Sequence, residues 1–310
     1  MWVERGFEEL RLRGPAALTI GAFDGVHRGH QALISRLVES AGEADLPALV
    51  VTFDPLPRQI FGRPEGSLLS SIEERLAQIE ALGVDGTLLL TFDREFASTR
   101  ASHFVTLLEE RLRIAQLFLG PDFALGYQQE GDVAFLRQAG QERGFDVEVV
   151  PHVFYAGAPI HSSRIRAVLQ AGDVVEARVM LGRPYSLGGT VVHGEGRGHE
   201  LGLPTANLRV PPERLLPALG VYACRARTDA QSWGAVLNLG HRPTFPEERV
   251  TVEAHLLDFE GDLYDQALHL ELLARLRSER EFDSEEALVT QIREDVRRAR
   301  TRLATELPLL

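Results

Sequence analysis

The chain has 310 residues, 44% of them hydrophobic and 25% charged, with a formal net charge of −12. This length suits two domains, and the negative charge argues against nucleic acid or an anionic membrane as the main partner. The single cysteine, Cys224, excludes an intrachain disulfide and a cysteine-based zinc site.

The beginning of the chain, residues 1–14, alternates charged with apolar residues and lacks the apolar region of a signal peptide. No apolar run in the sequence is long enough to span a membrane. We therefore expect a cytoplasmic protein.

The first half of the chain alternates strand-like with helix-like segments. Apolar runs that end in Gly, Asp or Pro predict strands at residues 17–23, 47–55, 86–92, 115–123 and 145–151. Apolar residues at helical spacing between them predict helices over residues 33–41, 72–82, 102–113 and 132–143, and further helix continues to about Gly182. Nearly continuous apolar strands alternating with helices indicate a Rossmann-like α/β fold, with a parallel sheet covered on both faces.

The second half has a different texture. Short alternating segments, punctuated by Gly, Pro and Asp, lie at residues 189–194, 220–228, 232–240, 249–259 and 267–276. They predict a small antiparallel β-barrel or sheet. A helical stripe over residues 288–303 follows, and Asp283 with Glu286 predicts a capping box at its start. We place the boundary near Arg183, which gives domains 1–182 and 183–310.

Two histidines follow the first buried strand of the predicted sheet. Ligands of open parallel sheets bind beyond the carboxyl ends of the strands, and a helix N-terminus favours phosphate. Gly21 and Gly25 would let the backbone approach a ligand, and His27 and His30 could donate hydrogen bonds to a phosphate whose charge grows. A metal site with Asp24 as a third ligand, and a structural role in capping the helix, are the alternatives.

The segment GAFDGVHRGH, residues 21–30, resembles the nucleotidyltransferase motif of prokaryotic FAD synthetases, whose fold is related to class I aminoacyl-tRNA synthetases. Residues 160–166, IHSSRIR, resemble that family's second motif, with His161 in place of a serine. Hydroxyls followed by arginine suit triphosphate oxygens. The resemblance implies that His27 and His30 are catalytic, and that ATP phosphates are bound by Gly21, Phe23, Asp24, Gly25, Gly29, Ser162, Ser163 and Arg166.

Two further stretches match this family in part. Residues 52–58, TFDPLPR, have Leu56 where a histidine is usual. Residues 120–132, GPDFALGYQQEGD, resemble the flavin-side segment, which implies that Asp122 and Phe123 face FMN, although Leu125 replaces an aromatic residue and Gln128 a basic one. A turn aspartate and a core phenylalanine are equally good interpretations of Asp122 and Phe123.

The glycine-rich stretch at residues 188–207 has no helix behind it, so it is not a dinucleotide fingerprint. A loop that folds over phosphates and a plain surface hairpin are both open. Its end, Pro204 to Asn207 (PTAN), resembles the signature of riboflavin kinases. The oxygens of Thr205 and Asn207 are hard ligands on one face of an extended segment. The resemblance implies that both bind Mg²⁺ and ATP, together with Gly194, Gly196 and Gly198, and that His199 stands at a usually basic position.

A kinase that acts on an alcohol needs a base to accept the hydroxyl proton. Glu253 projects from one face of its predicted strand, while Val252 and Ala254 share the other. An exposed strand glutamate is the simplest interpretation of composition alone. Residues 253–259 resemble the kinase family's E-x-H-[LI]-x-D-F segment, which implies that Glu253 is the catalytic base. Residues 238–245 match as well, and Arg242 there would serve the nucleotide or the fold.

The resemblance covers nearly the whole chain and implies a bifunctional enzyme of flavin cofactor biosynthesis. Such an enzyme phosphorylates riboflavin to FMN with ATP and Mg²⁺, then adenylylates FMN to FAD and releases pyrophosphate. Its partners would be riboflavin, FMN and ATP, while the oligomeric state is not readable. The alternatives are a riboflavin kinase with a weakened adenylyltransferase domain, because of the substitutions above, and a flavin-binding protein without catalysis.

Overall fold

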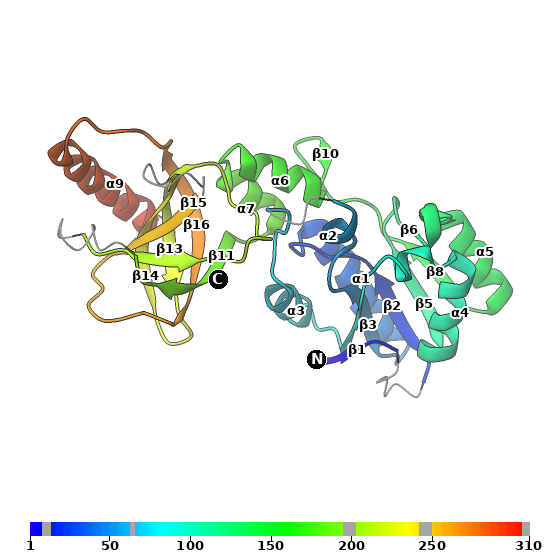
Figure 1. Ribbon diagram of the computed structural model, residues 1–310. Helices are drawn as coiled ribbons and strands as arrows, with labels where there is room; N and C mark the ends of the chain where they lie inside the picture. The colour runs from blue at the N-terminus through cyan, green and yellow to red at the C-terminus, as the bar shows by residue number, and fades with distance from the viewer. Residues whose placement is uncertain (8–13, 63–65, 195–202, 242–249, 306–310) are drawn as a thin grey trace. The chain divides into compact units, whose positions relative to one another are not determined.

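The structure of the chain is a computed structural model, which describes residues 1–7, 14–62, 66–194, 203–241 and 250–305 (Figure 1). The contacts between Cα atoms divide the chain into two compact units, Met1–Ser162 and Ser163–Leu310. The first unit contains a parallel sheet with helices, and the second contains a closed barrel with helices.

The first unit is built on a six-stranded parallel sheet with strand order β1-β4-β3-β2-β5-β8. The strands are β1 (Trp2–Arg5), β2 (Ala16–Ile20), β3 (Ala48–Phe53), β4 (Gly86–Leu90), β5 (Ile114–Leu119) and β8 (Asp146–Val149). The helices are α1 (Arg28–Glu43), α2 (Pro57–Phe61), α3 (Ile72–Glu80), α4 (Ala101–Leu112) and α5 (Val133–Arg143). The short elements are η1 (Phe96–Ser98), η2 (Tyr127–Gln129) and the antiparallel pairs β6 (Ala124–Leu125) with β7 (Gly131–Asp132) and β9 (Phe154–Tyr155) with β10 (Ala158–Pro159). The predicted parallel sheet is confirmed, and β1 is a strand that the sequence pattern did not indicate.

Hydrophobic cores lie on both faces of this sheet, because successive side chains of each strand point to opposite faces. Leu18 and Ile20 of β2 belong to one core together with Phe104 of α4. Ala17 of the same strand belongs to the other core, together with Ile34 of α1. Helices therefore cover both faces, as a parallel sheet of buried strands requires.

The second unit is built on a closed antiparallel barrel with strand order β11-β12-β15-β14-β13-β16. Its strands are β11 (Tyr185–Val192), β12 (Ala206–Arg209), β13 (Gly220–Arg227), β14 (Ser232–His241), β15 (Val250–Leu256) and β16 (Ala267–Arg277). Its helices are α6 (Ser162–Gln170), α7 (Val174–Leu181) and α9 (Glu285–Thr305). Ala299 of α9 packs in a core with Val221 and Leu276 of the barrel. The predicted barrel with a closing helix is confirmed.

Helices α6 and α7 belong to the same compact unit as the barrel, apart from Ser162 at the start of α6. The backbone N–H of Ala218 donates to the carbonyl of Leu169 at the end of α6, at 3.0 Å. The boundary between the two functional domains at residues 182 and 183 stays a prediction.

The cap of α9 differs from the prediction by one residue. The Ser284 hydroxyl accepts the N–H of Ala287 at 3.2 Å, and the helix begins at Glu285. Ser and Asp are about equally good N-caps, so the local pattern could not choose between Ser284 and Asp283.

Candidate active sites

The carboxyl ends of β2 and β5 form the first candidate site. The chain passes from β2 to β3 on one side of the sheet and later returns to β5 on the other side. Strand order therefore reverses between β2 and β5, and ligands of open α/β sheets bind at such a switch point. Residues 21–30 follow β2, and residues 120–123 follow β5.

The loop between β2 and α1 has an unusual backbone. Phe23 and Val26 have positive φ angles of 48° and 36°, and Gly25 has a φ of 78°. A β-branched residue such as Val26 is strongly disfavoured in this region, so surrounding contacts must hold the loop. The Gly25 N–H donates to the Ser70 hydroxyl at 3.0 Å, which is one of these contacts.

Asp24 supplies more of the contacts that hold this loop. Its buried carboxylate accepts the N–H groups of Leu69 at 2.9 Å and Ser70 at 3.2 Å. The Ser162 hydroxyl donates to the backbone carbonyl of Asp24 at 3.1 Å. The Asp24 carboxylate thus anchors residues 69–70, and its predicted part in phosphate binding stays a prediction.

His27 and His30 meet at the N-terminus of α1. His27 is the N-cap and is only 5% exposed, and its Nδ1 accepts the backbone N–H of His30 at 3.3 Å. The two rings stack with 3.6 Å between their centroids and 17° between their planes. Because Nδ1 of His27 is an acceptor, its neutral ring carries the proton on Nε2 and can donate from there. His27 therefore has the capping role that the sequence offered as an alternative. Capping uses only Nδ1, so Nε2 can still contact a ligand.

His30 carries a buried Nδ1 with no hydrogen-bond partner in the described part of the chain. Burial lowers the pKa of His30 well below its ordinary value, and the nearby charges of His27 and His161 lower it further. A neutral His30 would bind a phosphate by hydrogen bonding. The unpaired nitrogen fits a site that a ligand completes.

Gly29 lies in a tightly packed part of this motif. A Cβ at this position would lie 3.1 Å from the His27 ring and 3.5 Å from the carbonyl oxygen of Ile160. A Cβ at Gly21 would lie 3.0 Å from the Phe23 ring. Both predicted glycines therefore leave space that aromatic rings of the same motif occupy.

The other predicted residues of this site lie in different surroundings. Phe123 packs against the core that contains Leu18. Leu56, which stands where the resembled family usually has a histidine, belongs to the same core with 3% exposure. The exposed carboxylate of Asp122 pairs with Nε2 of His152 at 3.1 Å. Ser163 and Arg166 belong to the second unit, so their approach to the phosphates stays a prediction.

Three adjacent strands of the barrel carry the second candidate site. Glu253 on β15 is in register with Asn207 on β12 and with Asn238 on β14. Residues directly opposite each other in neighbouring strands have side chains on the same face. Glu253 is half-buried, whereas Val252 and Ala254 are buried on the opposite face. The structure thus places one carboxylate between two amides.

Asn238 joins this candidate site through its pairing with Glu253, and the motifs did not single it out, although it opens the matched segment 238–245. The available signal was its position between Leu237 and Leu239, which are both fully buried. A polar residue between two core residues of one strand points to the opposite face, which Glu253 also occupies.

Asn207 lies close to Gly194 of the glycine-rich segment. Asn207 is in register with Val192, and a Cβ at Gly194 would lie 2.2 Å from the Asn207 amide nitrogen. His255 Nδ1 lies 2.8 Å from the Pro204 carbonyl, which fixes the segment before Thr205. A hydroxyl, amide oxygens and a carboxylate form a hard donor set, which suits Mg²⁺. Gly196, Gly198, His199 and Arg242 lie outside the described residues.

Comparison with known proteins follows the same division of the chain. The model of the FAD synthetase family matches residues 11–164, and that of the riboflavin kinase family matches residues 181–303. A protein of Pseudomonas fluorescens named bifunctional riboflavin kinase/FMN adenylyltransferase is 41% identical over 304 residues, which are 97% of each chain. Namesakes from Escherichia coli K12 (38% identical, 91% of each chain) and Bacillus subtilis (34%, 92% of this chain and 91% of the other) agree.

The chain belongs to the bifunctional riboflavin kinase/FMN adenylyltransferase family. The resemblance stated from the motifs is confirmed.

A crystal structure described as a macrolide-efflux protein from Streptococcus pneumoniae has the fold of this family member, with a TM-score of 0.89 and 29% identity. The match covers 97% of this chain and 99% of that one. Among the described residues of the present chain, none of the helices has the length and apolar character that crossing a membrane would need.

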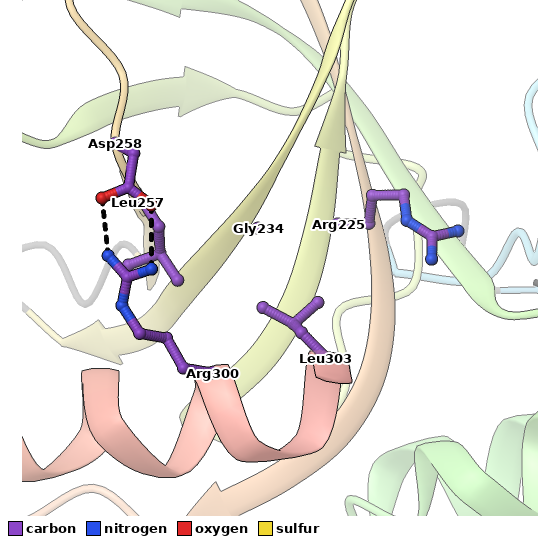
Figure 2. Close-up of a pocket in the computed structure, with 6 residues that line it drawn as sticks. All are labelled: Arg225, Gly234, Leu257, Asp258, Arg300 and Leu303. Carbon is purple, nitrogen blue, oxygen red and sulfur yellow. Dashed lines mark hydrogen bonds and ion pairs between the residues drawn. The ribbon is translucent and has the colours of Figure 1, made fainter. Parts of the chain in front are cut away.

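The barrel of the present chain also has a pocket of about 360 Å³ beside α9 (Figure 2). Its lining consists of Arg225, Gly234, Leu257, Asp258, Arg300 and Leu303. Arg300 donates to both carboxylate oxygens of Asp258 at 2.8 and 2.7 Å, and these hydrogen bonds lower the pKa of Asp258. The pair ties the segment that follows Glu253 on β15 to α9.

Proposed function

We propose that this chain phosphorylates riboflavin to FMN in its barrel and adenylylates FMN to FAD at the switch point of its sheet. The observation that carries this proposal is that each half of the chain matches one enzyme family and contains a matching set of side chains. The row Asn207–Glu253–Asn238 lies in the kinase half, and the stacked pair His27–His30 lies in the synthetase half.

In the kinase reaction, the Glu253 carboxylate would accept the proton of the terminal ribityl hydroxyl of riboflavin. The hydroxyl oxygen then forms a bond to the γ-phosphorus of ATP with the electron pair that deprotonation leaves on it. The bond from that phosphorus to the bridging oxygen breaks, and ADP leaves. The Thr205 hydroxyl and the Asn207 amide oxygen would hold Mg²⁺, which when bound neutralises phosphate charge. Gly194 leaves the space that Asn207 fills.

In the adenylyltransferase reaction, a phosphate oxygen of FMN bonds to the α-phosphorus of a second ATP. The bond from that phosphorus to the bridging oxygen breaks, and pyrophosphate leaves. His27, His30 and the N-terminus of α1 would stabilise the charge that develops on the α-phosphate. Ser162, Ser163 and Arg166 would hold the β- and γ-phosphates, and Asp122 and Phe123 would face FMN.

Neither reaction needs a covalent enzyme intermediate, so positioning and electrostatics supply the catalysis. Matches to both families along the chain favour two activities over a kinase alone. We expect both reactions to take place in the cytoplasm.

The test is to incubate the chain with riboflavin, ATP and Mg²⁺ and to separate riboflavin, FMN and FAD. FAD is the expected end product. Accumulation of FMN without FAD would favour the kinase alone, and absence of turnover would favour a flavin-binding protein.

A further inference from the structure

Three side chains that can bind a metal ion converge in the first unit, outside the His27–His30 pair. Asp122 follows β5, His152 follows β8 and His161 precedes α6. Their ligand atoms all lie within 4.8 Å of one another, and Asp122 Oδ2 lies 3.1 Å from His152 Nε2. The rings of His152 and His161 meet edge to face with 5.2 Å between centroids.

The chemistry of these donors favours one class of ion. Imidazole nitrogens suit zinc and similar transition metals, whereas Mg²⁺ prefers oxygen. Zinc binds nitrogen and oxygen at about 2.0–2.2 Å, so neighbouring donors in a tetrahedral site lie about 3.3 Å apart. Asp122 and His152 are already at this spacing. An ion pair between these two alone would not account for the third donor, His161.

The cluster is also open to solvent, so a metal ion and a further ligand can reach it. The side chain of Asp122 is 72% exposed and that of His152 is 26% exposed. Three protein ligands with solvent on one side are typical of a zinc site that keeps an open position. His161 stands where the matched motif has a serine, so the motif itself does not supply this cluster.

We propose that Asp122, His152 and His161 bind a divalent transition-metal ion of the zinc class and leave a coordination position open. The carbonyl of Ile160, the residue before His161, lies 3.5 Å from the position of a Gly29 Cβ at the N-terminus of α1. An ion held by His161 would therefore lie near the N-terminus of α1, where a phosphate of the proposed adenylyltransferase site could reach its open position. This second part rests on the proposed function.

Titration calorimetry of the metal-free full chain with Zn²⁺ tests the site. One equivalent should bind. His152→Ala, His161→Ala and Asp122→Asn should each weaken binding more than about 100-fold, since losing an outer partner of a ligand alone can cost that much. The exposed His103 of α4 provides the matched control, and His103→Ala should bind zinc as the unaltered chain does.

The proposed site would be refuted if the unaltered chain bound less than one equivalent of zinc. It would also be refuted if His152→Ala and His161→Ala bound zinc as tightly as the unaltered chain. His30→Ala should retain zinc, and its loss there would move the ion to the His27–His30 pair and equally refute the assignment. Circular dichroism checks that each variant folds.

The open position has its own test. Cobalt-loaded protein should change its visible absorption when inorganic pyrophosphate is added and the cobalt remains bound. An unchanged spectrum would refute access of phosphate to the ion. Both measurements are independent of whether FAD forms, so they separate this inference from the proposed function.

Discussion

The ring of His30 stacks on the His27 ring and meets the Phe23 ring nearly at right angles, with 5.2 Å between the centroids of Phe23 and His30. This position shields the half-buried imidazole from water and places it near the imidazoles of His27 and His161, so the charged form is disfavoured. A histidine that stays neutral can donate or accept a hydrogen bond without a change of charge during the reaction. Glu253 differs in that it is half-buried on a strand of the barrel, between two amide side chains.

The lowered pKa of His30 predicts that acid destabilises the first unit. Below the ordinary histidine value of 6.5 the unfolded chain binds a proton that folded His30 does not, so the free energy of unfolding falls as pH falls. Urea unfolding at about pH 7.5 and about pH 5.5 measures this loss. His30→Gln should lose less stability than the unaltered chain over the same interval. Equal losses would show that His30 does not contribute.

Removal of the Glu253 carboxylate should affect one reaction only. Glu253→Gln should slow FMN formation by about 10²–10⁴-fold, the usual contribution of a general base. Conversion of supplied FMN to FAD should be unchanged, because the histidines proposed for that reaction, His27 and His30, lie in the other unit. Glu260→Gln, an exposed glutamate seven positions further along, is the control for loss of charge. Equal loss of both reactions in Glu253→Gln would contradict the assignment.

At the scale of elements, the first candidate site is built on the N-terminus of a helix, whereas the second is built on side chains of adjacent strands. Helix α1 begins directly after the loop that follows β2. Its N-terminus lies at the switch point, where N–H groups and the helix dipole favour an anion. The barrel instead aligns single side chains from β12, β15 and β14, because the antiparallel register places them opposite one another.

Two glycines of α1 give a matched test of the helix site. Gly29→Ala should push the His27 ring from its place and lower FAD formation by about 10-fold or more, since small misplacements of reacting groups are costly. Gly42→Ala lies on the same helix, where a Cβ would meet nothing within 4 Å, and should stabilise the helix by up to about 1 kcal/mol. Rates of FMN-to-FAD conversion and urea unfolding measure both effects. Similar rates in the two variants would contradict the packing role of Gly29.

At the scale of the whole molecule, two units with different folds each carry a candidate site. The proposed product of the barrel, FMN, is the proposed substrate of the sheet. Neither reaction leaves the flavin covalently bound, so FMN can reach the second site through solution.

Two inactive variants should therefore complement each other when mixed. Glu253→Gln alone should leave riboflavin unconverted, and His30→Ala alone should stop at FMN. An equimolar mixture should form FAD from riboflavin, which chromatography of the flavins measures. A mixture that forms FMN but no FAD would show that FMN must pass within one chain.

Much of this organisation was already determined by the sequence. Continuous apolar strands between amphipathic helices specify a parallel sheet because both of its faces must be buried, and the alternation of Val252, Glu253 and Ala254 specifies which side chain leaves the core. The motifs singled out His27, His30, Thr205, Asn207 and Glu253 as candidates, and their roles at phosphate or metal stay predictions.

Only the tertiary structure decided what these residues contact. The pairing of Asn238 with Glu253 depends on strand register, and the anchoring of Asp24 to residues 69–70 depends on a contact across 45 positions. The meeting of Asp122, His152 and His161 depends on the order of β5 and β8 in the sheet. Periodicity in a sequence reports which face of an element is buried, whereas contacts between distant segments follow from how the elements pack.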